Sequence, residues 1–226
     1  MNKDIRLDFE RTPAAIVAQA AQYQAAILAD VAGRRGGLNG RVKPLAPRMK
    51  VAGPAFTVEV RPGDNLIIHA AMSLARPGDV LVIDGKGDLN SALMGTIMMT
   101  ACKQLGLAGV VIDGAVRDTL EIDEMDYPVF AAGANPNGPS KGLGGRIGHP
   151  VSVGGVTVAA GDFILGDADG VVAVERHKIE SLLPLAAKKV ADEAARIAAI
   201  RQGDTAAKWL TSALRAAGVL KEGETL

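Results

Sequence analysis

The chain of 226 residues has one cysteine, 3% aromatic residues and no excess charge of either sign. Its single cysteine cannot form an internal disulfide, and the charged start of the sequence lacks the apolar core of a signal peptide, so we expect a cytoplasmic protein. Its 25 Lys+Arg and 25 Asp+Glu cancel, which removes the overall attraction that nucleic-acid binders and peripheral membrane proteins use. Apolar runs are shorter than the roughly 18 residues that span a bilayer. We therefore expect no nucleic-acid partner and no membrane partner.

The hydrophobic content is high at 48%, and glycine is common with 27 residues. A chain of this length and composition buries a sizeable core, and no shift in composition marks a linker. We therefore expect a single domain over 1–226, with a core of about 14–176 and C-terminal helices over about 177–217. Because aromatic stacking platforms are few, small-molecule chemistry is favoured.

Helical periodicity marks both ends of the chain. From about Thr12 to Arg35, apolar residues recur at intervals of three and four, with Thr12 as the expected cap. A second helical pattern runs from about Glu175 to Ala217 and breaks at 202–204. Between them, short β-branched runs predict strands within 51–60, 78–85, 109–116, 151–158 and 169–175.

A near-repeat links two of these strands. LVIDG at 81–85 and VVIDG at 110–114 lie 29 positions apart, with a helical pattern of Ala, Met and Leu between them. Strand, helix and strand at this spacing predict a βαβ unit whose strands are parallel. Both Asp-Gly pairs are then expected at the carboxyl edge of the sheet, where α/β proteins usually bind ligands.

The segment GVVIDGAVRD at 109–118 carries the strongest local signal for chemistry. A buried strand ends there in a polar turn that projects Arg117 and Asp118. If both side chains face one pocket, Asp118 can bind a hard divalent cation, and Arg117 can hold an anion or a developing oxyanion. The alternative is an ordinary turn with two exposed charges.

Glycine-rich sequence leads from the strand ending near Gly85 into a helix that is expected to begin near Gly95 or Thr96. The backbone N–H groups of Gly95, Thr96, Ile97 and Met98 are candidates for holding a carboxylate or a phosphate. The alternative is a plain connection capped by Thr96. No nucleotide-binding glycine motif is present, and the three histidines and the cysteine are expected to be structural or exposed.

Taken together, these segments resemble a known family. They are similar to those of regulator of ribonuclease activity A and of the 4-hydroxy-4-methyl-2-oxoglutarate / 4-carboxy-4-hydroxy-2-oxoadipate aldolases, from about 14 to 219. The segments are VAGPAFTV at 51–58, PGDVLVIDG at 77–85, ALMG at 92–95, GLAGVVIDGAVRD at 106–118, PVF at 128–130 and GDFILGDADGVVAVER at 161–176. The resemblance implies an α/β fold of the swivelling phosphohistidine-domain type, with a β/β/α arrangement and N-terminal and C-terminal helices. It also implies a homotrimer or homohexamer with sites between subunits.

The resemblance also implies roles for particular residues. The aldolase branch keeps the Arg-Asp turn, whereas the regulator branch loses the metal-binding aspartate, so Asp118 favours an enzyme. By this resemblance Asp118 anchors Mg²⁺ or Mn²⁺, Arg117 stabilises the enolate oxygen, and the backbone of Gly95 to Met98 holds the pyruvyl carboxylate. These positions are the expected catalytic, substrate-binding and metal residues.

Two further positions concern the water around the metal. In the family a glutamate from the neighbouring subunit's late helix takes part, and Glu193 is the candidate, with Asp192 next. Aldolases commonly carry an acidic residue directly after the loop glycine, where this chain has Thr96. Because Thr96 supplies no negative charge, the outer water shell or the preferred substrate is expected to differ.

We therefore expect a divalent-metal-dependent (class II) pyruvate aldolase, a carbon-carbon lyase. Its expected substrates are 4-hydroxy-4-methyl-2-oxoglutarate or 4-carboxy-4-hydroxy-2-oxoadipate, which are cleaved to pyruvate and a second oxo acid. Loss of carbon dioxide from oxaloacetate forms the same pyruvate enolate, so oxaloacetate decarboxylase activity is expected as well. Two alternatives stay open: a non-catalytic ribonuclease-inhibiting binding protein, and a lyase or hydratase for another 2-oxo acid.

Overall fold

The computed structural model describes residues 4–221 and 223–224 of the chain. They form a mixed α/β structure with two compact units, one ending at Ala186 and the other beginning at Ala187. The division falls inside the long helix α6, Ile179–Arg201. The first unit holds the sheet and the helices α1 to α5, and the second holds the rest of α6 and the short helix α7, Leu210–Ala216.

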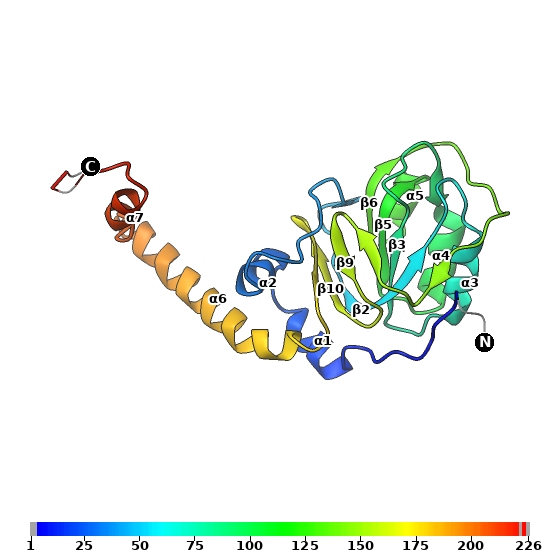
Figure 1. Ribbon diagram of the computed structural model, residues 1–226, viewed down its shortest axis with the longest axis horizontal. Helices are drawn as coiled ribbons and strands as arrows, with labels where there is room; N and C mark the ends of the chain where they lie inside the picture. The colour runs from blue at the N-terminus through cyan, green and yellow to red at the C-terminus, as the bar shows by residue number, and fades with distance from the viewer. Residues whose placement is uncertain (1–3, 222, 225–226) are drawn as a thin grey trace. The chain divides into compact units, whose positions relative to one another are not determined.

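Within the described residues, nine strands of the first unit form one sheet (Figure 1). Seven lie in the order β1-β6-β5-β3-β2-β10-β11, while β4 pairs with β5 and β7 pairs with β2. The pairs β2-β3, β3-β5, β4-β5 and β5-β6 are parallel. The strands are β1 Lys43–Pro44, β2 Val51–Glu59, β3 Val80–Asp84, β4 Ala92–Met94, β5 Gly109–Val116, β6 Val129–Ala134, β7 Arg146–Ile147, β10 Phe163–Asp167 and β11 Gly170–Val174.

The central strands are buried on both faces. In β3, Leu81 and Ile83 pack in a core on the side of the helices, whereas Val80 and Val82 belong to a second core on the opposite side. Because both faces are covered, every residue of β3 is buried, and all of its residues before Asp84 are hydrophobic. The hairpin of β8, Val151–Val153, and β9, Val156–Val158, supplies three valines to the second core, namely Val151, Val153 and Val158.

The two ends of the sheet approach each other. Lys43 in β1 donates a hydrogen bond of 2.6 Å from Nζ to the carbonyl oxygen of Asp169, in the turn between β10 and β11. Gly37 forms an antiparallel bridge with Val172 of β11. The sheet is therefore nearly closed, as in a barrel, and the expected α/β fold is confirmed.

Three helices of the first unit follow strands of the parallel part of the sheet. They are α3, Leu66–Leu74, α4, Thr96–Gln104, and α5, Thr119–Glu124. Each buries apolar residues in the same core, for example Ile68, Met99 and Ile122. The predicted βαβ unit is confirmed, because β3 and β5 pair in parallel and α4 lies between them in the chain.

The N-terminal helical segment is divided in two, which corrects the expectation of one continuous face from Thr12 to Arg35. The helices are α1, Ala14–Ala20, and α2, Ala25–Val31. The buried carboxylate of Asp167 accepts a hydrogen bond of 2.8 Å from the backbone N–H of Ala25 and so fixes the start of α2. Thr12 does not cap α1, because its hydroxyl donates to the carbonyl of Gly161 at 2.9 Å.

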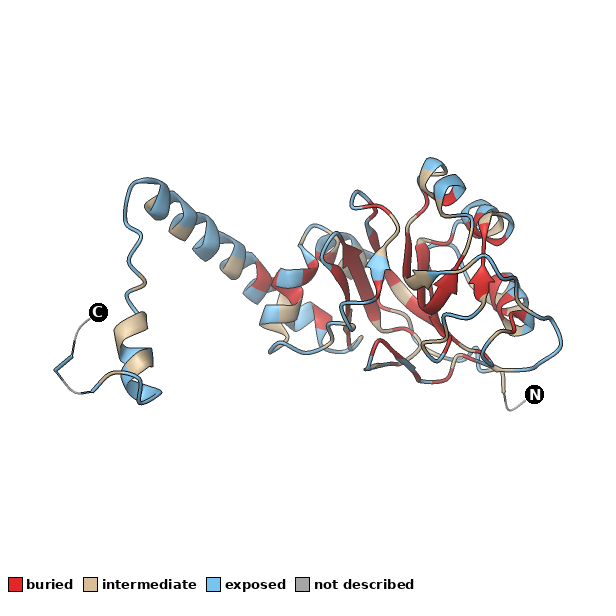
Figure 2. Cartoon of the chain, turned by 90° about the horizontal axis from the view of Figure 1, so that it is seen from above, coloured by how far each residue is buried: buried red, intermediate tan, exposed pale blue. Residues whose placement is uncertain are grey.

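The C-terminal helix breaks where the sequence predicts. After α6, Gly203 has a positive φ of 96°, and the guanidinium of Arg196 donates to the carbonyls of Asp204 and Ala206, each at 2.9 Å. Buried residues are concentrated in the sheet and the elements packed on it, whereas α6 beyond Ala186 is largely exposed (Figure 2). No helix in the described part of the chain is long and apolar enough to cross a membrane.

Candidate active site

The candidate site forms where two neighbouring parallel strands end. Met94, the last residue of β4, pairs with Val116, the last residue of β5. The backbone N–H of Arg117 then donates a hydrogen bond of 3.0 Å to the carbonyl of Met94. This bond places the Arg117-Asp118 turn beside Gly95 and the first turn of α4.

Asp118 has a left-handed backbone conformation, with φ 60° and ψ 44°, at the residue before α5. Aspartate is one of the few residues besides glycine that adopt this conformation readily. Its Oδ2 atom accepts a hydrogen bond of 3.0 Å from the backbone N–H of Thr96 and lies 3.8 Å from Nε of Arg117. The conformation thus directs the carboxylate to the N-terminus of α4, where the helix dipole favours negative charge.

Two glycines make room for the Arg-Asp turn. A Cβ atom added to Gly95 would lie 2.4 Å from Asp118 Oδ2 and 2.9 Å from Arg117 Cγ. A Cβ atom on Gly138 would lie 2.9 Å from Nη1 of Arg117. Only glycine allows both side chains to lie this close to the backbone.

A pocket of about 140 Å³ opens beside this turn. Its wall contains Arg117 and Asp118 together with Gly95 and Met98 from the start of α4. The side chains of Arg117 and Asp118 are 42% and 37% exposed, so both are accessible to a ligand. The structure therefore brings the two charged residues that the sequence singled out to one pocket.

The backbone at the start of α4 is partly occupied, which corrects the expectation of four free donors. Thr96 N–H donates to Asp118, and Met98 N–H donates to the carbonyl of Gly95 at 3.1 Å. The N–H of Ile97 lies in the first turn of α4, where a helix offers it no acceptor. Two of the four N–H groups therefore already donate within the protein, one to the Arg-Asp turn and one to the carbonyl before the helix.

Glu193 lies in the second unit, on α6. Its carboxylate is 2.8 Å from Nζ of Lys189, one helical turn earlier. Asp192 is paired in the same way with Lys188. The contribution of Glu193 to a neighbouring subunit's site stays a prediction.

The carboxylate oxygens of Asp118 are suitable ligands for a hard divalent cation. Within residues 4–221 and 223–224 no three His, Cys, Asp or Glu side chains gather in a group that could hold a metal ion. Mg²⁺, however, is usually bound through one or two carboxylates, with water and substrate completing its shell. The two contacts that described residues make to the carboxylate of Asp118 both use Oδ2, which leaves Oδ1 for a ligand.

Three residues of the pocket wall carry no sequence signal for this site. Asn65 comes directly before α3, His69 lies one turn along it, and Lys141 belongs to the loop before β7. Asparagine before an apolar helical run predicts a cap, and a lone histidine or lysine predicts nothing specific. Only the tertiary fold brings these residues to the Arg-Asp turn.

Asp64 fixes the loop that carries Lys141. Its buried carboxylate accepts hydrogen bonds from the backbone N–H of Gly142 at 2.7 Å and of Leu143 at 3.1 Å, and from the hydroxyl of Ser140 at 2.7 Å. Burial raises the pKa of Asp64, but these bonds outweigh that effect and lower the pKa to about 2. The ionised carboxylate therefore holds the loop at the pocket.

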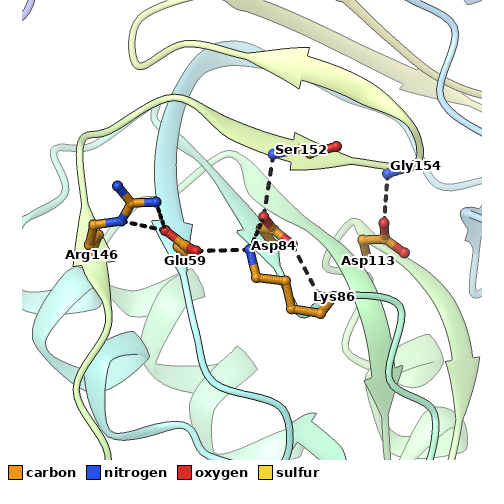
Figure 3. Close-up of polar contacts among 7 residues, drawn as sticks. All are labelled: Glu59, Asp84, Lys86, Asp113, Arg146, Ser152 and Gly154. Carbon is orange, nitrogen blue, oxygen red and sulfur yellow. Dashed lines mark hydrogen bonds and ion pairs between the residues drawn. The ribbon is translucent and has the colours of Figure 1, made fainter.

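The Asp-Gly pairs of the near-repeat serve the fold, which corrects their expected place at a ligand edge. Asp84 and Asp113 are buried, and their carboxylates accept backbone N–H bonds from Ser152 at 3.3 Å and Gly154 at 2.8 Å (Figure 3). Asp113 also pairs with Arg41 at 2.7 Å. These aspartates hold the β8-β9 hairpin against the sheet and do not line the pocket at the Arg-Asp turn.

A larger hollow of about 670 Å³ lies beside Glu59, Lys86 and Arg146. These three charged residues already pair with one another (Figure 3). Lys86 Nζ lies 2.8 Å from Glu59 and 2.7 Å from Asp84, and Arg146 also pairs with Glu59. Because these charges are satisfied within the protein, the smaller pocket at the Arg-Asp turn is the better candidate for chemistry.

Residues 16–173 match the RraA-like family, described as Aldolase/RraA. The chain belongs to this family. A relative from Halalkalibacterium halodurans is 44% identical over 163 residues, which are 72% of this chain and 78% of that protein. Its provisional name is 4-hydroxy-4-methyl-2-oxoglutarate aldolase. The expected family, including the similarity to an aldolase-named member, is therefore confirmed.

Solved structures share the fold. The RNA-processing inhibitor RraA from Thermus thermophilis is 32% identical, with a TM-score of 0.62 over 67% of this chain and 92% of that one. An uncharacterized protein from Pseudomonas syringae has a TM-score of 0.77 at 24% identity, over 87% of this chain and 97% of that one. At this identity the second likeness shows the fold alone.

Proposed function

We propose that the chain is a divalent-metal-dependent pyruvate aldolase that cleaves the carbon-carbon bond of a 4-hydroxy-2-oxo acid. The observation that carries the proposal is the arrangement of Arg117 and Asp118. The guanidinium of Arg117 and the carboxylate of Asp118 share a pocket at the N-terminus of α4, beside a glycine that has no space for a side chain. The similarity to the Halalkalibacterium halodurans relative supports this reaction class.

Charge development assigns the role of Arg117. Cleavage moves the electron pair of the C3–C4 bond into the pyruvyl half, which becomes an enolate. The C4 hydroxyl gives up its proton and becomes the carbonyl of the second oxo acid, and the enolate then takes a proton at C3 to give pyruvate. Because negative charge develops on the C2 oxygen, a guanidinium that faces the pocket stabilises the transition state.

Asp118 would hold Mg²⁺ or Mn²⁺ through its carboxylate. When bound, the ion supplies Lewis acidity to the 2-oxo group. The N-terminus of α4, with the N–H of Ile97, would hold the substrate carboxylate beside it. Lys141 gives the pocket wall a second cation, which suits a substrate with a second carboxylate.

The same arrangement supports decarboxylation of oxaloacetate. Loss of carbon dioxide leaves the electron pair on the pyruvyl half as the same enolate, and a proton at C3 again gives pyruvate. We therefore propose oxaloacetate decarboxylase as a side activity of the pocket that contains Arg117.

The test is pyruvate release from 4-hydroxy-4-methyl-2-oxoglutarate and from oxaloacetate, with Mg²⁺, with Mn²⁺ and with a chelator. Removal of an oxyanion stabiliser costs about 3–4 kcal/mol, so Arg117→Ala is expected to lower kcat roughly a hundredfold or more. Asp118→Asn is expected to abolish the metal-dependent rate, while Lys103→Ala, at the far end of α4, serves as the control. Turnover of Arg117→Ala within tenfold of wild type would contradict the role of Arg117.

A second candidate is a protein that inhibits RNA processing, since the relative from Thermus thermophilis is an RNA-processing inhibitor. The aspartate at 118 favours the enzyme, because the resemblance associates it with the aldolase branch. A ribonuclease inhibition assay on the same preparation separates the two. Inhibition that survives Asp118→Asn, with no turnover of either substrate, would favour the binding protein.

We also propose that the chain assembles as a homotrimer or a homohexamer. Large apolar side chains of the second unit are exposed on α6 and just before α7, including Ile197 and Ile200 at 49% and 44% and Trp209 at 68%. Exposed apolar surface of this kind is typical of association. Light scattering would then give three or six times the chain mass of 23.3 kDa, and a monomeric mass would refute the assembly.

A further inference from the structure

Asn65 lies in the wall of the pocket at the Arg-Asp turn. Asn65 immediately precedes α3 and is 3% exposed. Both its backbone N–H and its backbone carbonyl form hydrogen bonds. The backbone N–H donates to the carbonyl of Ser140 at 3.0 Å, and the carbonyl accepts from the N–H of Ile68 at 3.1 Å. The position of this side chain is therefore set by the loop before β7 and by α3 together.

The orientation of the Asn65 amide is determined by its neighbours. Nδ2 donates to the carbonyl of Leu93 at 2.9 Å and to Sδ of Met98 at 3.3 Å. A reversed amide would put Oδ1 against the carbonyl oxygen of Leu93, and two acceptors would then face each other. Oδ1 is consequently the atom left for another partner.

No donor among residues 4–221 and 223–224 reaches Oδ1 of Asn65, although the atom is buried. A buried acceptor without a donor destabilises the folded protein. Every other polar side chain that the mechanism uses in this pocket is charged, namely Arg117, Asp118 and Lys141. Asn65 thus adds one neutral acceptor whose geometry is fixed in advance.

The substrate class proposed above carries one group that matches this acceptor. Its carboxylates and its 2-oxo oxygen only accept hydrogen bonds, whereas its C4 hydroxyl donates. We propose that Oδ1 of Asn65 accepts the hydrogen bond of the C4 hydroxyl and so favours hydroxylated substrates over oxaloacetate, whose keto form has no such group. This inference rests on the proposed function and names the residue that would set its substrate preference.

The test compares two substrates in the same variants. Asn65→Leu removes the acceptor at similar volume, and its kcat/KM for 4-hydroxy-4-methyl-2-oxoglutarate is expected to fall ten- to a hundredfold. Its kcat/KM for oxaloacetate is expected to stay within threefold of wild type. Asn90→Leu, at an exposed asparagine outside the pocket wall, is the matched control and should change neither value.

A second variant separates the acceptor from the tether to Leu93 and Met98. Asn65→Asp keeps an oxygen at the place of Oδ1 but turns a second oxygen toward the carbonyl of Leu93. It is therefore expected to be less stable and to retain the preference for the hydroxylated substrate. Thermal unfolding and assembly mass are measured for each variant. If Asn65→Leu does not fold, Asn65→Asp tests the inference instead. It is then expected to keep the preference for the hydroxylated substrate. 2-Oxoglutarate, which lacks the hydroxyl, is expected to inhibit this variant competitively with the same strength as it inhibits the wild-type protein.

The outcomes distinguish the two proposals. An equal loss on both substrates in Asn65→Leu, or a preference lost in Asn65→Asp, would overturn the role of Asn65 and leave the aldolase function intact. No turnover of either substrate by the metal-loaded wild-type protein would instead overturn the proposed function, and the role of Asn65 with it.

Discussion

The carboxylate of Asp118 accepts a hydrogen bond of 3.0 Å from the backbone N–H of Thr96. This bond joins the turn after β5 to the first turn of α4, two segments that are separated by a whole helix and a strand in the sequence. It also removes one free donor from the helix N-terminus and places a negative charge there. The position of the candidate metal ligand is therefore set by α4 as well as by its own turn.

We predict that Gly95→Ala damages the site more than the fold. An added Cβ atom would lie 2.4 Å from Asp118 Oδ2 and would push the Arg117-Asp118 turn away from α4. Overpacking of this kind typically costs about 1–3 kcal/mol, and pyruvate release is expected to fall at least tenfold. Gly144→Ala is the matched control, because a Cβ atom there meets nothing within 4 Å. Equal activity of the two variants would contradict the prediction.

Asp113→Ala is expected to destabilise the protein without changing substrate preference. The substitution leaves the N–H of Gly154 and the guanidinium of Arg41 without their buried partner, a loss of about 2–3 kcal/mol in the free energy of unfolding. Urea unfolding measures the loss, with Asp169→Ala at an exposed turn as the control. A large increase in KM at unchanged stability would show that Asp113 faces a ligand after all.

The strands and the Arg-Asp turn could be predicted from the sequence because the determining signals are local. A strand buried on both faces is a continuous hydrophobic run, as in 109–112, and its end is marked by an abrupt change to charge at Arg117. The parallel pairing of β3 and β5 follows from their spacing and from the helix between them. The same logic located the break between α6 and α7 at a glycine.

The remaining features depend on contacts between distant segments. The break between α1 and α2 is fixed by Asp167, more than a hundred positions later in the chain. Asp84 and Asp113 have the pattern of ligand-binding residues, but the β8-β9 hairpin occupies them. Asn65 and Lys141 reach the pocket from α3 and from the loop before β7. No local pattern contains this information.

Cys102 is predicted to be unreactive in the folded protein. The residue is fully buried in α4, and burial raises the pKa of its thiol to about 12. Because the thiolate is the reactive form, a maleimide at pH 8 is expected to label the chain only after unfolding. Cys102→Ala is expected to keep kcat/KM within twofold of wild type. Rapid labelling of the native protein together with loss of activity would contradict this.

Asp64 is predicted to make stability depend on pH in the acid range. Burial raises its pKa, but hydrogen bonds from Gly142, Ser140, Leu66 and Leu143 lower it to about 2, below the ordinary value of 3.8. A carboxyl with a lowered pKa stabilises the folded state above its unfolded-state pKa, and this contribution is lost as the pH falls toward 2. Unfolding of the wild-type protein is therefore expected to become easier between about pH 4 and pH 2.

Asp64→Asn removes the charge and tests both the pH dependence and the loop. Since the buried charge-assisted bonds are weakened, the variant is expected to be less stable at pH 7 by about 1–2 kcal/mol, and the difference should shrink as the pH approaches 2. The loop that carries Lys141 loses its anchor, so KM for a dicarboxylate substrate should rise more than kcat falls. Asp169→Asn, at an exposed turn, is the control. A stability difference that is constant from pH 7 to pH 2 would show that the ionised carboxylate does not hold this loop.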